Sequence, residues 1–130
     1  MIQRLIECVP NFSEGRNMQI IKQITDEIEK IEGVKLLNVD PGAATNRTVV
    51  TFVGAPEQII EAAFQAIKKA GEVIDMRQHH GEHPRMGATD VCPFIPIAGV
   101  TMEECAQYSR TLAKRVGEEL MIPVYFYESA

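Results

Sequence analysis

The order of strand-like and helix-like hydrophobic segments along the sequence constrains the fold of this chain more than any other feature. Short apolar, β-branched segments at residues 5–9, 34–39, 48–53 and 89–97 are typical of strands. Between them, two longer segments repeat Ile and Ala at helical spacing. The order strand–helix–strand–strand–helix–strand predicts a ferredoxin-like βαββαβ sandwich. This α/β (α+β) fold would carry its helices on one face of a mixed, mostly antiparallel sheet.

Residues with known preferences for helix ends support this order. Asn17 is a candidate N-cap of the first helix, and Gly33 is a candidate stop. Pro56 stands where a second helix would begin, a position that tolerates proline. Thr101 and Glu104 have capping-box spacing and predict a third helix.

Punctuating residues predict where the strands end and how the chain continues. We expect Pro10 and Asn11 to end the first strand, and residues 40–47 to form a loop. Pro123 is expected to stop the third helix before a last strand at residues 124–127. The sandwich is therefore extended by a further helix and strand, and one face of its sheet is left uncovered. Such a face usually meets another sheet, another chain or a ligand.

Composition narrows the class of protein. The 130 residues suit one domain, residues 1–130, and the net charge of -5 argues against nucleic acid or an acidic membrane as partners. Arg4 and Glu7 interrupt the apolar N-terminus, so we expect no signal peptide. Three widely spaced cysteines then indicate reduced thiols and a cytoplasmic location.

One segment concentrates the residues with useful chemistry. It holds all three histidines, His79, His80 and His83, together with Arg85. Imidazole exchanges protons near neutral pH, and guanidinium binds carboxylates, so the segment suits an acidic substrate. The alternative is a solvated polar loop in which the histidines gather by chance.

A metal site is the competing interpretation of the same segment. The spacing of His79, Glu82 and His83 matches the letters of an inverted zincin pattern. That pattern needs a helix, which Gly81 and Pro84 disfavour, and no thiolate pair stands nearby. We therefore expect no metal.

Two other polar stretches are candidates for the same site. Asn11 follows the first strand, while Asp40, Asn46 and Arg47 follow the second. Asp40 could orient an imidazole or stabilise a cationic group, although Asp before Pro-Gly also commonly stabilises a turn. Asn46 and Arg47 could likewise be turn residues. No glycine-rich phosphate motif is present in the sequence, so nucleotide binding has no support.

Five motifs make the chain similar to a known family, glutamate formiminotransferase. They are ECVPNFSEG (7–15), TNRT (45–48), TFVG (51–54), GEHPRMGA (81–88) and DVCPFIP (90–96). The resemblance runs from about Leu5 to the C-terminus, and motifs of this length in this order are highly specific. The family includes the transferase part of formiminotransferase-cyclodeaminase.

The resemblance implies an activity in histidine degradation. The family transfers a formimino group from N-formimino-L-glutamate to N5 of tetrahydrofolate, its co-substrate. The family motif places the catalytic acid/base at His83, and the family's aspartate after the second strand makes Asp40 the second catalytic candidate. The candidate substrate-binding residues are Asn11, Asn46, Arg47, His79, His80 and Arg85.

The resemblance also implies that this chain is one of two ferredoxin-like subdomains, with folate held between them. It corresponds to the N-terminal subdomain. We expect the second subdomain in cis or in trans, or a homo-oligomer formed through the uncovered sheet face. The alternative is a non-catalytic folate-binding or protein-interaction module derived from that subdomain.

Overall fold

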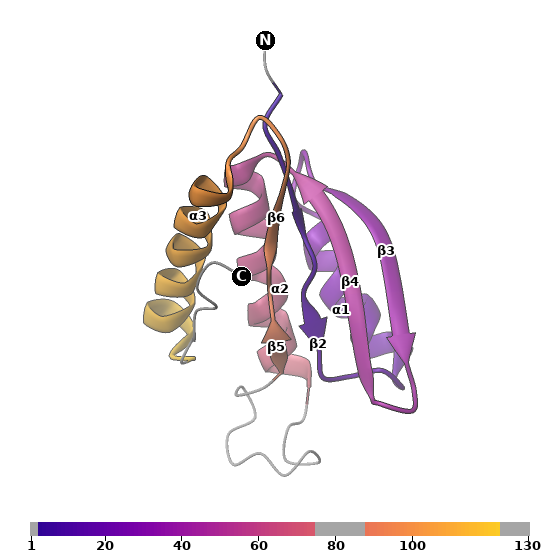
Figure 1. Cartoon of the computed structure of the whole chain (residues 1–130). Helices are drawn as coiled ribbons and strands as arrows, with labels where there is room; N and C mark the ends of the chain where they lie inside the picture. Colours follow the sequence, from indigo (N-terminus) through magenta and orange to yellow (C-terminus); the bar gives the residue numbers. More distant parts are fainter. Residues whose placement is uncertain (1–2, 75–87, 123–130) are drawn as a thin grey trace.

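A computed structural model describes residues 3–74 and 88–122 as one sheet covered by one layer of helices (Figure 1). The strands are β1 (Leu5–Cys8), β2 (Asn11–Phe12), β3 (Lys35–Gly42), β4 (Arg47–Gly54), β5 (Thr89–Val91) and β6 (Phe94–Ala98). The helices are α1 (Met18–Glu29), α2 (Pro56–Val73) and α3 (Met102–Arg115), which continues into a π-helical turn, η2 (Val116–Leu120). The histidine segment and the expected last strand lie outside the described residues.

β1 ends at Cys8, before Pro10 as predicted, but the chain runs straight on and Asn11 opens β2 instead of a loop. β1 and β2 pair with β4 in one unbroken register, and the Pro10 carbonyl accepts a hydrogen bond from the Val50 N–H at 3.0 Å between them. Proline lacks an N–H, so it removes one bond from the ladder without turning the chain. Asn11 is therefore a strand residue in the middle of the sheet.

The loop predicted for residues 40–47 is also shorter than expected. β3 runs on through Pro41 to Gly42, and β4 begins at Arg47. β3 pairs only with β4 among the described strands, and proline is tolerated on such an edge strand. Asp40 therefore projects from a strand.

The sheet topology confirms the predicted fold class. β1 and β2 together lie between β4 on one side and β5 with β6 on the other, while β3 flanks β4. All described strand pairs are antiparallel. This is the arrangement of a ferredoxin-like sandwich, with α3 added after it.

The three helices lie side by side on one face of the sheet, with α2 between α1 and α3 (Figure 1). Every second strand residue faces the helices. In β4, buried residues therefore alternate with exposed or half-buried ones along the whole strand. The core joins both layers, and its fully buried members include Ile6, Cys8, Val50, Phe52, Ile28, Ile59 and Ala63. The helical pattern in the sequence is therefore the pattern of this interface.

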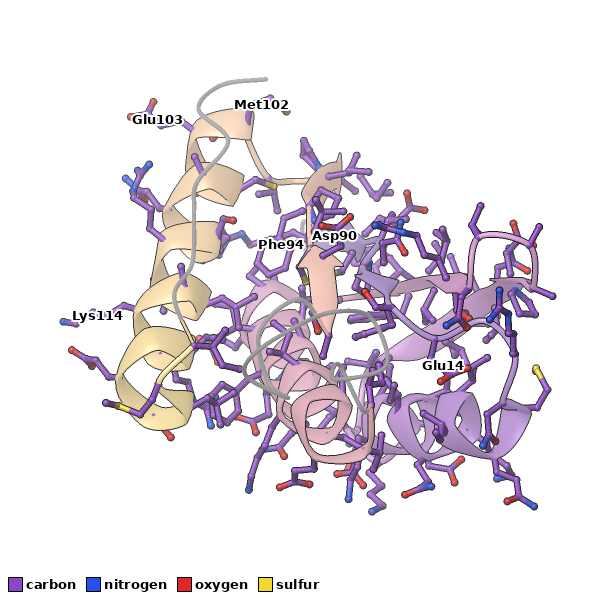
Figure 2. All side chains as sticks on the ribbon, turned by 90° about the horizontal axis from the view of Figure 1, so that it is seen from below. Glu14, Asp90, Phe94, Met102, Glu103 and Lys114 are labelled. Atoms are coloured by element: carbon purple, nitrogen blue, oxygen red, sulfur yellow. The ribbon has the colours of Figure 1, made fainter. Side chains whose placement is uncertain are left out.

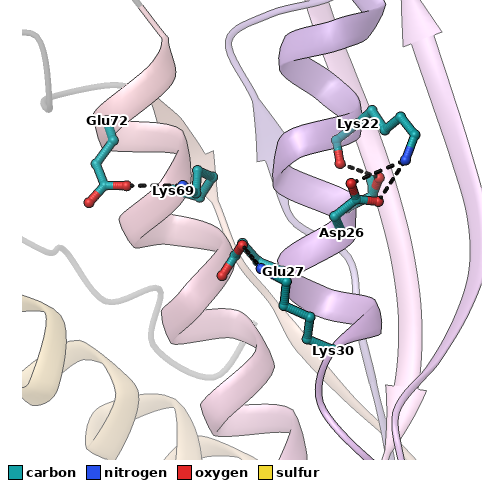
Figure 3. A network of polar contacts seen from close by, with 7 residues as sticks. Lys22, Asp26, Glu27, Lys30, Lys69 and Glu72 are labelled. Carbon is teal, nitrogen blue, oxygen red and sulfur yellow. Dashed lines mark hydrogen bonds and ion pairs between the residues drawn. The ribbon is translucent and has the colours of Figure 1, made fainter.

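The outer sides of the helices are charged. Ion pairs one turn apart join Lys22 to Asp26 on α1 at 3.1 Å and Lys69 to Glu72 on α2 at 3.4 Å (Figure 3). Such exposed pairs add little stability and mark a solvated surface. No described helix is long and apolar enough to cross a membrane.

The opposite face of the sheet is open, as predicted. Among the described elements no helix covers it (Figure 1). Ile95 and Ile97 of β6 are 40% and 52% exposed, and Val53 of β4 is half-buried there. One end of this face carries polar side chains instead.

Candidate functional site

Strand pairing places predicted site residues in one row across the open face. Asp40 on β3 pairs with Val49 on β4, which pairs with Asn11 on β2, which pairs with Val91 on β5. Paired residues of adjacent strands share a face. Asp40 and Asn11, 29 positions apart in sequence, therefore flank a single valine (Val49).

This row borders a pocket of about 350 Å³. Its lining residues are Asn11, Asp40, Pro41, Gly42, Thr45, Arg47 and Val49. The volume is in the lower part of the range of small-molecule sites. Three of the predicted site residues, Asn11, Asp40 and Arg47, thus meet at one pocket.

Asn11 lines the pocket and carries a buried acceptor without a described partner. Its Oδ1 atom is buried and, within the described part of the chain, has no hydrogen-bond partner. A buried carbonyl oxygen without a donor costs free energy, so such an atom calls for an explanation.

The turn between β3 and β4 is fixed by the segment that follows β2. Asn46 adopts a left-handed conformation with φ 54°, and its Oδ1 accepts a hydrogen bond from the Gly15 N–H at 2.9 Å. Arg16 Nε donates to the Ala43 carbonyl at 2.9 Å. Asn46 does not line the pocket, but it shapes the turn that does.

Gly15 permits this contact. A Cβ atom there would lie 2.6 Å from the Arg47 carbonyl oxygen and closer still to the Gly42 oxygen. Real side chains never approach backbone so closely. The two loops can therefore touch only because residue 15 lacks a side chain.

Arg47 is held by a residue that the sequence analysis did not select. Its Nη1 donates to Asp90 Oδ2 on β5, and the two side chains are 46% and 47% exposed. The two partners are 43 positions apart, so no local pattern predicts the pair. The only hint in the sequence is that Asp90 opens the DVCPFIP motif.

After the histidine segment, the described part of the chain resumes at a residue bonded to the end of β2. Ala88, the first described residue after that segment, accepts a hydrogen bond through its carbonyl from the Ser13 N–H at 2.9 Å. Ser13 follows directly on β2. His79, His80, His83 and Arg85 themselves lie outside the described residues.

Two of the cysteines are close together in the core. Cys8 and Cys92 place their Sγ atoms 3.4 Å apart. Burial, followed by the contact with Cys92, raises the pKa of the Cys8 thiol well above its ordinary value. Cys8 is therefore a protonated core thiol at neutral pH.

In residues 3–74 and 88–122, no group of three or more His, Cys, Asp or Glu side chains could hold a metal ion. The polar groups at the pocket are instead an amide oxygen, a carboxylate, a hydroxyl and a guanidinium. Such a set is suited to an organic ligand that carries both N–H donors and an anionic group.

The fold and the pocket define a ferredoxin-like α+β domain with a small pocket, lined by polar and apolar groups, on the open face of its sheet. The family described as the formiminotransferase domain, N-terminal subdomain, matches residues 5–130. The chain belongs to this family.

Individual relatives agree with that assignment. The chain is 55% identical over 129 residues to a formimidoyltransferase-cyclodeaminase of Dictyostelium discoideum, covering 99% of the chain and 24% of that protein. It is 50% identical over 127 residues to a glutamate formimidoyltransferase of Streptococcus pyogenes, covering 98% and 42%. It is 52% identical over 126 residues to one of Thermoplasma acidophilum, covering 97% and 42%. The chain thus spans less than half the length of these relatives.

Proposed function

We propose that this chain carries the substrate pocket and the catalytic histidine of a glutamate formimidoyltransferase. The reaction would move the formimino group from N-formimino-L-glutamate to N5 of tetrahydrofolate. The observation that carries the proposal is the 50% identity to the Streptococcus pyogenes glutamate formimidoyltransferase over 98% of the chain. The pocket of Asn11, Asp40 and Arg47 supports it, because N-formimino-L-glutamate carries both an N–H-bearing amidine and two carboxylates.

The pocket residues have matching roles in this proposal. Asn11 Oδ1, buried and without a described donor, accepts a hydrogen bond from the formimino N–H. Asp40 stabilises the positive charge of the amidinium. Arg47 binds a carboxylate of the substrate, and Arg85 is proposed to assist it. His79 and His80 are proposed as further contacts to the same substrate.

His83 moves the proton. Tetrahydrofolate N5 attacks the formimino carbon, a C–N bond forms, and the N5 proton passes to the His83 imidazole. The tetrahedral intermediate then breaks its bond to the glutamate nitrogen, and His83 returns the proton to that nitrogen. The products are L-glutamate and the N5-formimino folate. Bringing both reactants together on the open sheet face supplies much of the remaining acceleration.

The test is turnover with His83→Ala. General acid–base catalysis contributes roughly 10²- to 10⁴-fold, so we expect a loss of that size with unchanged thermal unfolding. Gln78→Ala, in the same segment, is the matched control and should keep the wild-type rate. An unchanged rate in His83→Ala would contradict the assigned role.

A second candidate is a folate-binding or protein-interaction module without activity of its own. It is favoured by one observation: the chain covers only 24% or 42% of the relatives compared. If the second subdomain is needed, the chain alone should bind N-formimino-L-glutamate without turnover. Adding the missing part, in cis or in trans, should then restore transfer. A chain that binds neither reactant but self-associates through the open sheet face would favour the interaction module.

A further inference from the structure

We propose that Asp90 is a positioning residue, which holds the Arg47 guanidinium over the pocket in the orientation that receives a substrate carboxylate. This inference rests on the proposed function. Asp90 does not line the pocket, and it would act through Arg47 alone.

A bulge in β5 places Asp90 where it can do this. Asn11 pairs with Val91, but Phe12 pairs with Thr89, so the register shifts and Asp90 is the extra residue. A bulge of this kind turns a side chain to a different face, and bulges are frequent beside active sites. Asp90 therefore lies on the open face of the sheet, and Figure 2 shows its label beside the strands, away from the helices.

The ion pair between Arg47 and Asp90 crosses one strand of the sheet. Arg47 begins β4 and Asp90 lies in β5, with β2 between them. Strands are about 4.8 Å apart, so the pair reaches across roughly 10 Å of sheet and passes over β2, the strand that contains Asn11. This contact brings the guanidinium to the side of the pocket where the buried Asn11 amide lies.

One bond to Asp90 leaves the other donors of the guanidinium available. Asp90 engages Nη1, and among the described residues no other hydrogen bond is made by the Arg47 side chain. A guanidinium has five N–H donors in a rigid plane, so fixing one nitrogen fixes the direction of the rest. A pair as exposed as this one adds little stability, which makes the orientation of Arg47 its main consequence.

Asp90→Asn is the direct test, because it removes the charge and keeps the size of the side chain. Binding of N-formimino-L-glutamate to this chain is measured by calorimetry. The Nε–H signal of Arg47 is followed by NMR in the same samples. We expect the dissociation constant to rise roughly 5- to 30-fold, the loss of one charge-assisted interaction. The Arg47 Nε–H signal should show a more mobile side chain. Asp90→Glu, which keeps the charge, should restore part of the affinity and part of the order of Arg47.

Two further variants separate positioning from other causes. In an Arg47→Gln background, Asp90→Asn should add no further loss, because the two residues act as a unit. Glu103→Gln removes an equivalent exposed carboxylate at the start of α3 (Figure 2) and should leave binding unchanged.

Each outcome decides one point. Equal or tighter binding in Asp90→Asn overturns the positioning role while leaving the proposed function intact. If the wild-type chain does not bind the substrate, the proposed function fails, and the inference about substrate fails with it. The Arg47 signal then still shows whether Asp90 orders the guanidinium.

Discussion

At the scale of single residues, the pocket depends on positions that contribute backbone space and unused polar atoms. Gly15 provides the space that lets the segment after β2 touch the turn between β3 and β4. Asn11 provides a buried hydrogen-bond acceptor that has no donor among the described residues. Arg47 is the positively charged residue in the lining of the pocket. Each of these features can be removed by one substitution.

Gly15→Ala should destabilise the fold by about 1–3 kcal/mol, the usual cost of forcing a methyl group into filled space. The added Cβ would collide with backbone atoms of Gly42 and Arg47, which cannot swing away as a side chain can. Urea unfolding measures the change. Gly117→Ala is the control, because a Cβ there meets only the Ile122 oxygen at 3.9 Å. The control should be neutral or slightly stabilising. Equal effects of the two variants would contradict the close approach at Gly15.

Cys8 predicts how stability changes at alkaline pH. Its pKa is raised in the folded state by burial and by Cys92, whereas the unfolded thiol ionises near its ordinary value of about 8.5. Above that pH the unfolded state binds fewer protons than the folded state, so the free energy of unfolding falls as pH rises. The contribution is complete below the unfolded pKa and is lost progressively up to the folded one. Cys8→Ala should show a shallower alkaline decline in denaturation experiments, whatever its stability at pH 7. An unchanged slope would show that Cys8 titrates normally.

At the scale of elements, the helices follow from local sequence. Asn17 caps α1 by accepting hydrogen bonds from the N–H groups of Gln19 and Ile20, as its position predicted. The predicted capping box of α3 is present, with Thr101 and Glu104 each accepting from the other's backbone N–H at 3.0 and 2.9 Å. These motifs act within four residues, so a sequence is enough to find them.

Thr101→Ala should cost about 1 kcal/mol of stability, because it leaves the first turn of α3 without its side-chain cap. Thr111→Ala is the matched control in the same helix. Its hydroxyl bonds back to the Gln107 carbonyl and caps nothing, so alanine there should be neutral or stabilising. Thermal unfolding compares the two. If Thr111→Ala lowers the stability as much as Thr101→Ala does, loss of the cap is not the cause of the destabilisation.

The strands and the site were less predictable, for a physical reason. Whether the chain turns after Pro10 or runs on as β2 depends on the distant Val50, whose N–H bonds to the Pro10 carbonyl. Asp40 and Asn11 could be named as candidates from their residue types, but only the sheet register brings them beside Val49. Asp90 was missed because its role depends on a bulge and on a partner in another strand.

At the scale of the whole molecule, helices cover one face of the sheet, and no described helix covers the other. Helices α1, α2 and α3 bury the inner face of the sheet, while the described elements leave the outer face with exposed Ile95 and Ile97. The pocket lies on that outer face, the side from which the second reactant would arrive in the proposed reaction. The relatives compared are more than twice as long as this chain.

The central claim is that the pocket of Asn11, Asp40 and Arg47 binds N-formimino-L-glutamate. An NMR titration of this chain with that compound, observing the Asn11 side-chain amide and the Arg47 Nε–H, tests it most directly. The account predicts saturable shifts of both signals, and clearly weaker binding of L-glutamate, which lacks the formimino group. No saturable change at either residue, or equal binding of L-glutamate, would contradict it.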